Sequence, residues 1–253
     1  MGRGDDPSEV LSGELGEADA EQRVLRQTYA LHEAGHAVAA SVLGLSLGSV
    51  ELIRGPDSGS SANGITRAMP PGPDTSASSF PSGTLVGAAA VSPEIAWLAY
   101  LYAGGVAETR ATGQPNPIGR YSDRMAAQNW LADLNLQPSR RREYRDRAEI
   151  LADEIVAACW PLIEEIAAEL AAIGTLLGAY IEGRYATRVG GIDWGALMAR
   201  VDARQTAGDI PRSFSWAELA EAAGFPPDLA AALVAMNDDD PADDERGTAA
   251  QAR

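Results

Sequence analysis

The sequence predicts a mainly α-helical protein with one small two-stranded β-ribbon. Apolar residues recur at helical spacing over long segments rich in alanine and glutamate, of which residues 139–182 are the longest. Two short segments, residues 49–54 and 64–68, alternate as antiparallel strands do. Serine, glycine, proline and aspartate dominate residues 55–63 and 69–83, which indicates loops after each strand.

The first helix is expected over about residues 21–43, where apolar side chains follow a helical period. Gly44 then ends it in the manner of a C-cap. Residues 1–22 hold seven acids and one arginine. Because such a segment buries little apolar surface, it is expected to be disordered.

The second helix is expected over about residues 92–111, with the Ser92 hydroxyl as its N-cap. A loop with two prolines, residues 113–119, follows it. The next helix is expected to begin near Ser122 and to end before Pro138.

Residues 139–182 are expected to be helical, with Pro161 as a kink or as a new first turn. A shorter helix at residues 193–204 and a helical pair at 215–222 and 227–236 complete the pattern. The chain thus divides into a disordered acidic lead, one main domain, a small helical appendage and a disordered acidic tail, residues 1–22, 23–205, 206–236 and 237–253.

The net charge of −16 is concentrated at the two ends of the chain. Residues 1–22 contribute −6 and residues 237–253 contribute −4, which leaves about −6 for the body. With no large basic surface, nucleic-acid binding is disfavoured. One cysteine, Cys159, excludes an internal disulfide. No secretory leader and no uninterrupted apolar span is present, so a cytoplasmic protein without a membrane span is expected.

All twenty basic residues are arginine. A nucleotide-binding loop of the G-x-x-x-x-G-K-[ST] type requires a lysine on the phosphates. The chain therefore has no ATPase site of this type, and energy-driven unfolding of a substrate would require a separate protein.

The most informative motif is His32-Glu33-Ala34-Gly35-His36, which contains the only two histidines in the chain. Residues four apart lie on one face of a helix, so both imidazoles can reach one metal ion. Glu33 then lies beside the open coordination position, where it can take a proton from metal-bound water. Two ligands and a general base in five residues are typical of zinc hydrolases.

A catalytic zinc ion usually has three protein ligands and a water molecule. No third histidine exists, and Cys159 lies in an apolar helical segment where a buried, inert thiol is expected. The third ligand must therefore be a carboxylate. Spacing alone leaves four candidates, Glu51, Glu94, Glu108 and Asp123.

Residues 29–37 read Tyr-Ala-Leu-His-Glu-Ala-Gly-His-Ala, and residues 101–108 read Leu-Tyr-Ala-Gly-Gly-Val-Ala-Glu. These two segments resemble the peptidase domain of FtsH, the ATP-dependent zinc metalloprotease. The similarity covers roughly residues 25–182, and its other matching segments are residues 50–55, 64–66, 122–123 and 148–181.

The resemblance implies a zincin-type helical array with a β-ribbon over residues 23–205, Zn²⁺ as the cofactor, and Asp123 as the third zinc ligand. Glu108 is the alternative ligand, or else a residue that orients the site. The chain departs from the family at Thr109, where a second glutamate is usual, and in the residues before Asp123. It also contains no counterpart of the ATPase and membrane portions.

The expected activity is zinc-dependent hydrolysis of peptide bonds in unfolded proteins, peptides or one dedicated partner. Extended substrate is expected to add to a ribbon edge near residues 50–54 or 64–68. A separate ATPase or regulatory partner, or assembly as a homo-oligomer, is compatible with this function. The alternative is a regulatory or adaptor protein that keeps the peptidase fold and recruits a partner through residues 210–236. Specific cleavage of a repressor or toxin is a third reading.

Overall fold

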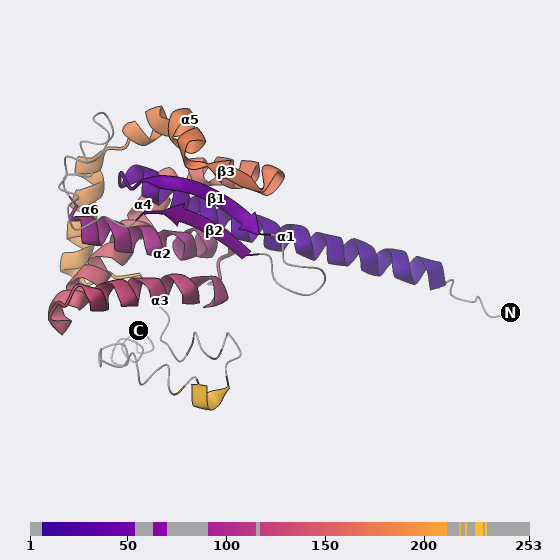
Figure 1. The fold of residues 1–253 in the computed structure, drawn as a ribbon, viewed down its shortest axis with the longest axis horizontal. Coiled ribbons are helices and arrows are strands. Elements are labelled where there is room, and N and C mark those ends of the chain that lie inside the picture. Colours follow the sequence, from indigo (N-terminus) through magenta and orange to yellow (C-terminus); the bar gives the residue numbers. More distant parts are fainter. Residues whose placement is uncertain are drawn as a thin grey trace.

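The computed structural model describes residues 7–53, 63–69, 91–114 and 117–211, together with a few positions between 218 and 231. Figure 1 shows a mainly helical molecule with one small sheet. In chain order the elements are α1 (Pro7–Val42), β1 (Leu47–Ile53), β2 (Asn63–Ala68), α2 (Pro93–Thr112), α3 (Pro117–Asp133), α4 (Pro138–Ile173), β3 (Thr175–Leu177), α5 (Gly178–Gly190) and α6 (Trp194–Ala207).

The sheet has three antiparallel strands in the order β2-β1-β3, so the prediction of a two-stranded ribbon was incomplete. The third strand, Thr175–Leu177, lies in a segment predicted to be helical. Gly174 adopts a left-handed conformation (φ 90°) that ends α4, and its carbonyl accepts a hydrogen bond from the amide of Leu52. A three-residue strand is too short to show an alternating pattern, which is why its sequence gave no strand signal.

The core forms where α1, α2 and α4 pack together and the sheet covers α1. Small side chains allow the first two helices to approach closely. A Cβ atom on Gly35 of α1 would lie 2.7 Å from the carbonyl oxygen of Ala103 and 2.7 Å from the Cβ of Ala107, both on α2. This close contact sets the distance between the helix that carries the histidines and the helix beside it.

The first helix is longer than predicted. It begins at Pro7, so residues 7–22, which were expected to be disordered, are helical. In Figure 1 the first part of α1 extends away from the rest of the molecule. The histidine motif lies in the other part, which is packed in the core.

The second helix confirms its predicted start. The Ser92 hydroxyl accepts a hydrogen bond from the amide of Ile95, and Gly113 caps the other end with a left-handed conformation. The predicted start of the third helix was wrong, because α3 begins at Pro117 rather than near Ser122. Asp123 is therefore inside the helix and does not cap it.

Helices α5 and α6 follow β3 and pack on the body. α6 agrees with the helix predicted at residues 193–204. The appendage predicted at residues 206–236 lies largely outside the described residues, as do the two predicted loops and the acidic tail. None of the helices in the described part of the chain combines the length and the apolarity needed to cross a bilayer.

Candidate metal centre

Two imidazoles from successive turns of α1 form the base of the site. His32 and His36 are both buried, with 5% and 4% of their surface exposed. Their ring centroids are 4.8 Å apart, and their Nε2 atoms lie 3.1 Å from each other. As the spacing of four predicted, both rings point to the same place.

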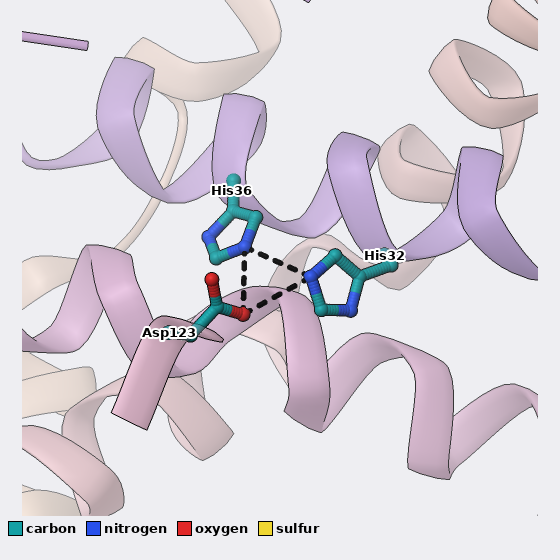
Figure 2. A group of neighbouring side chains, drawn as sticks. All are labelled: His32, His36 and Asp123. Carbon is teal, nitrogen blue, oxygen red and sulfur yellow. Dashed lines mark hydrogen bonds and ion pairs between the residues drawn. The ribbon is translucent and has the colours of Figure 1, made fainter. Parts of the chain in front are cut away.

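Asp123 brings a carboxylate to the same place from α3. Its Oδ2 lies 3.0 Å from Nε2 of His32 and 3.2 Å from Nε2 of His36. Figure 2 shows these three atoms as a closed triangle between α1 and α3. Among the described residues, they form a group whose ligand atoms all lie within 4.8 Å of one another and could hold a metal ion.

The opposite nitrogen of each ring is bonded to α2, and these contacts fix the tautomers. The Nδ1 of His36 lies 2.7 Å from the carbonyl oxygen of Tyr100, which can only accept, so this nitrogen carries a proton. The Nδ1 of His32 lies 3.1 Å from Oε2 of Glu108, which as a carboxylate also accepts. In each neutral ring the lone pair is therefore on Nε2, directed into the triangle.

The donor set fits a zinc ion. Three electron-pair donors converge on one point, an arrangement that needs a cation or extra protons to offset their mutual repulsion. Two imidazole nitrogens and one carboxylate oxygen are typical zinc ligands. Bonds of about 2.0–2.2 Å in tetrahedral geometry separate ligand atoms by roughly 3.3–3.6 Å. The observed 3.0–3.2 Å differs from this by only a small outward movement of the side chains.

The electrostatics of the site also favour a cation. Burial lowers the pKa of His32, but the Asp123 carboxylate and the hydrogen bonds to Asp123 and Glu108 outweigh it, so this pKa lies well above its usual value. The pKa of His36 is raised by the same balance of burial and Asp123. Burial raises the pKa of Asp123, but the two histidines reverse this effect and hold it well below its usual range.

Glu108, the alternative ligand, lies on the other side of His32. Its Oε2 contacts Nδ1 of that ring rather than the point where the three donors converge. The side chain is 1% exposed, and its second oxygen has no hydrogen-bond partner among the residues that the structure describes. A buried carboxylate in this position orients the imidazole and increases its basicity.

The predicted general base, Glu33, is also buried, with 5% of its surface exposed. Its carboxylate lies against β2, where the hydroxyl of Thr66 donates a hydrogen bond of 2.7 Å to Oε2. The strand leaves room for this side chain at Gly64, where a Cβ atom would lie 2.2 Å from the Cγ of Glu33.

α2 leaves similar room for the two rings. A Cβ atom on Gly104 would lie 2.3 Å from Nε2 of His36 and 2.8 Å from Nε2 of His32. The Nε2 atoms of both rings therefore lie directly against the backbone of α2 at Gly104. The neighbouring Ala103 and Ala107 are fully buried, which keeps α2 close to α1 at this level.

The other sequence candidates lie elsewhere. Glu51 is on β1 and accepts a hydrogen bond from the hydroxyl of Ser49, and Glu94 is in the first turn of α2. Cys159 is buried in α4, where desolvation raises the pKa of its thiol to about 11. Within the described residues none of them belongs to the converging group.

Sequence reasoning missed three residues of the site, Tyr100, Thr66 and Gly64. Tyr100 lies one helical turn before Gly104 and therefore on the same face of α2. Had Gly104 been placed against the two imidazoles, Tyr100 would have been expected there too. Gly64 and Thr66 lie on the same face of β2, the one toward α1, but only the strand register places them beside Glu33.

No protein-family model matches this chain, and no curated protein matches it significantly.

Proposed function

We propose that the chain is a zinc-dependent metalloendopeptidase that hydrolyses peptide bonds in unfolded proteins, peptides or a dedicated partner. The observation that carries this proposal is the convergence of His32 Nε2, His36 Nε2 and Asp123 Oδ2 in a buried site. A site that held zinc for structure alone would need no carboxylate next to the first ligand, whereas hydrolysis needs the base that Glu33 supplies. The resemblance to the FtsH peptidase domain supports the same activity.

In this mechanism His32, His36 and Asp123 would hold a zinc ion, which would supply an acidified water molecule and polarise the scissile carbonyl. Glu33 would accept the proton of that water and deliver it to the leaving amine. Glu108 and the carbonyl of Tyr100 keep the two imidazoles in the tautomer that directs Nε2 to the ion.

Extended substrate binds along β2 in this proposal. β1 is paired with β2 on one side and, over Ser49–Glu51, with β3 on the other, so this part of β1 is not a free edge. β2 is an outer strand of the sheet and touches Glu33 through Thr66. An extended peptide added to this strand would pass next to the base, which is the geometry that strand addition requires.

The substrates are polypeptides that are already unfolded. With no lysine in the chain, no P-loop of the Walker type can couple nucleotide hydrolysis to unfolding. A folded substrate would depend on a separate ATPase.

The test is cleavage of casein by the zinc-loaded protein, with zinc content measured by mass spectrometry. Wild-type protein is expected to bind about one zinc ion per chain and to cleave casein, and Glu33→Gln is expected to keep the zinc and lose the cleavage. Zinc-loaded wild-type protein that cleaves neither casein nor peptides, with or without an added ATPase, would instead favour an adaptor protein.

A further inference from the structure

We propose that Thr66 is a positioning residue, which holds the carboxylate of Glu33 in place for proton transfer. The proposal rests on the function proposed above and assigns a role in it to β2. In the sequence, residues 64–66 stand out only as a segment that matches the family. No role for Thr66 follows from that match, because its contact with Glu33 depends on how β2 is placed beside α1.

The strand register places this hydroxyl on the correct face. Thr66 is opposite Val50 and Gly64 is opposite Leu52, and both partners on β1 are buried. Since side chains on directly opposed residues lie on the same face, Thr66 and Gly64 face α1. Ile65, which lies between them and opposite Glu51, points to the other face.

Both oxygens of the Glu33 carboxylate lie against β2, and one of them accepts a hydrogen bond from it. The Thr66 hydroxyl lies 2.7 Å from Oε2 and 3.1 Å from the backbone carbonyl of Glu33. A charged oxygen is the stronger acceptor, so the proton of the hydroxyl goes to Oε2. The other oxygen lies over Gly64, where a Cβ atom would be 2.4 Å from Oε1.

A second contact anchors Thr66 to the metal site. The hydroxyl of Tyr100 donates a hydrogen bond of 2.9 Å to the carbonyl of Thr66. The carbonyl of the same tyrosine accepts the hydrogen bond from Nδ1 of His36. One residue of α2 thus connects a ligand to the strand that holds the base.

This arrangement predicts a defined effect on catalysis. A glutamate side chain has several rotatable bonds, and misplacement of a base costs rate rather than substrate affinity. Thr66→Val removes the hydroxyl at nearly constant shape, and valine suits a strand. Thr66→Ser keeps the hydroxyl and is the matched control.

The first measurement is hydrolysis of a fluorogenic peptide by zinc-loaded variants. Thr66→Val is expected to lower kcat about tenfold or more with KM changed less than about twofold, because a hydrogen bond to a charged group is lost. Thr66→Ser is expected to stay within about threefold of wild type. Zinc content and melting temperature verify that both variants are folded and loaded. Equal kcat in wild type and Thr66→Val would overturn the proposal while leaving the proposed function intact.

The second measurement needs no turnover. A peptide hydroxamate binds zinc and shares a proton with a neighbouring carboxylate, so calorimetry of its binding reports on Glu33. Thr66→Val is expected to weaken hydroxamate binding about fivefold or more when Glu33 is present, and not at all in a Glu33→Gln background.

The two failures are distinguishable. An equal loss of hydroxamate affinity in both backgrounds would show that Thr66 acts on the strand alone and would overturn the proposal. Wild-type protein that binds zinc and hydroxamate but cleaves no peptide would overturn the proposed function, and the calorimetric cycle would still decide the role of Thr66. Wild-type protein that binds no zinc would overturn both.

Discussion

Nδ1 of His32 lies 3.1 Å from Oε2 of Glu108, on the side of the ring that faces away from the other ligand atoms. Together with the bond between His36 and the carbonyl of Tyr100, this contact fixes both rings before an ion arrives. Both partners come from α2, although the histidines come from α1 and Asp123 comes from α3. The two imidazoles are therefore oriented by a helix that contributes none of the three groups that could hold a metal ion.

Replacing Glu108 by alanine is expected to lower zinc affinity about 10- to 100-fold, because an outer contact that orients a ligand is lost. Glu108→Gln keeps an acceptor for the ring proton and is expected to lose much less. Competition with a chromophoric chelator measures both affinities. If the alanine variant binds zinc as tightly as the glutamine variant, the hydrogen-bond acceptor at position 108 does not contribute to zinc affinity.

Gly104→Ala is expected to abolish zinc binding, because the added methyl group would lie 2.3 Å from Nε2 of His36. The matched control is Gly183→Ala in α5, where a Cβ atom would meet nothing within 4 Å. That control is expected to keep zinc and to gain about 0.5–1 kcal/mol of stability from the loss of a helical glycine. Zinc content and thermal unfolding distinguish the two variants, and a Gly104→Ala protein with full zinc content would contradict the packing described.

The metal-free protein is expected to lose stability as the pH rises. The pKa values of His32 and His36 are raised in the folded state. The stability that their pairing with Asp123 contributes is therefore complete below the unfolded pKa of about 6.5, and it is lost as the pH rises through the raised folded-state values. The pKa of Asp123 is lowered in the folded state, so the stability that its ionised carboxylate contributes is present above about pH 3.9 and is lost only at very low pH.

The measurement is the melting temperature of chelator-treated protein from pH 5 to pH 9. Asp123→Asn removes the negative charge and is expected to flatten this profile. Zinc competes with the protons on both rings, so zinc affinity is expected to rise over the same interval. A profile that is identical in wild type and Asp123→Asn would contradict the pairing.

Metal removal is expected to release α3 more than any other described helix. Of its described side chains only Ala127 and Leu131 are buried, and the helix lies along α2 at the side of the body (Figure 1). Trp130 packs on Trp97 of α2, but few side chains of α3 are fully buried, so an ion bound between α1 and α3 would supply part of its attachment. Hydrogen exchange with and without zinc measures this, and Asp123→Ala in zinc is expected to behave as the metal-free protein. Equal deprotection of α1, α3 and α4 would contradict it.

The sequence predicted the parts of this fold that local patterns determine. The capped start of α2 and the facing histidines follow from residues a few positions apart. Asp123 was different, since four carboxylates remained open on spacing, and only the resemblance selected it. Its helix was placed wrongly because Pro117 was interpreted as part of a loop, although proline is common in the first turn of a helix.

Contacts between distant segments were beyond the reach of the sequence. Thr66 meets Glu33 across 33 residues, and this contact exists only because β2 pairs with β1 in one register. The strand Thr175–Leu177 forms only because Gly174 turns the chain back along β1. Neither the register of β2 nor the turn at Gly174 produces a periodic pattern in the sequence.

His36 and Asp123 are 87 positions apart in the chain. An ion bound by both would act as a cross-link that closes a long loop, and such closures reduce the conformational freedom of the unfolded chain. With a single cysteine the protein cannot form this kind of link by oxidation. Chelation would then affect this protein much as reduction affects a disulfide-bonded one, by enlarging the ensemble from which it must refold.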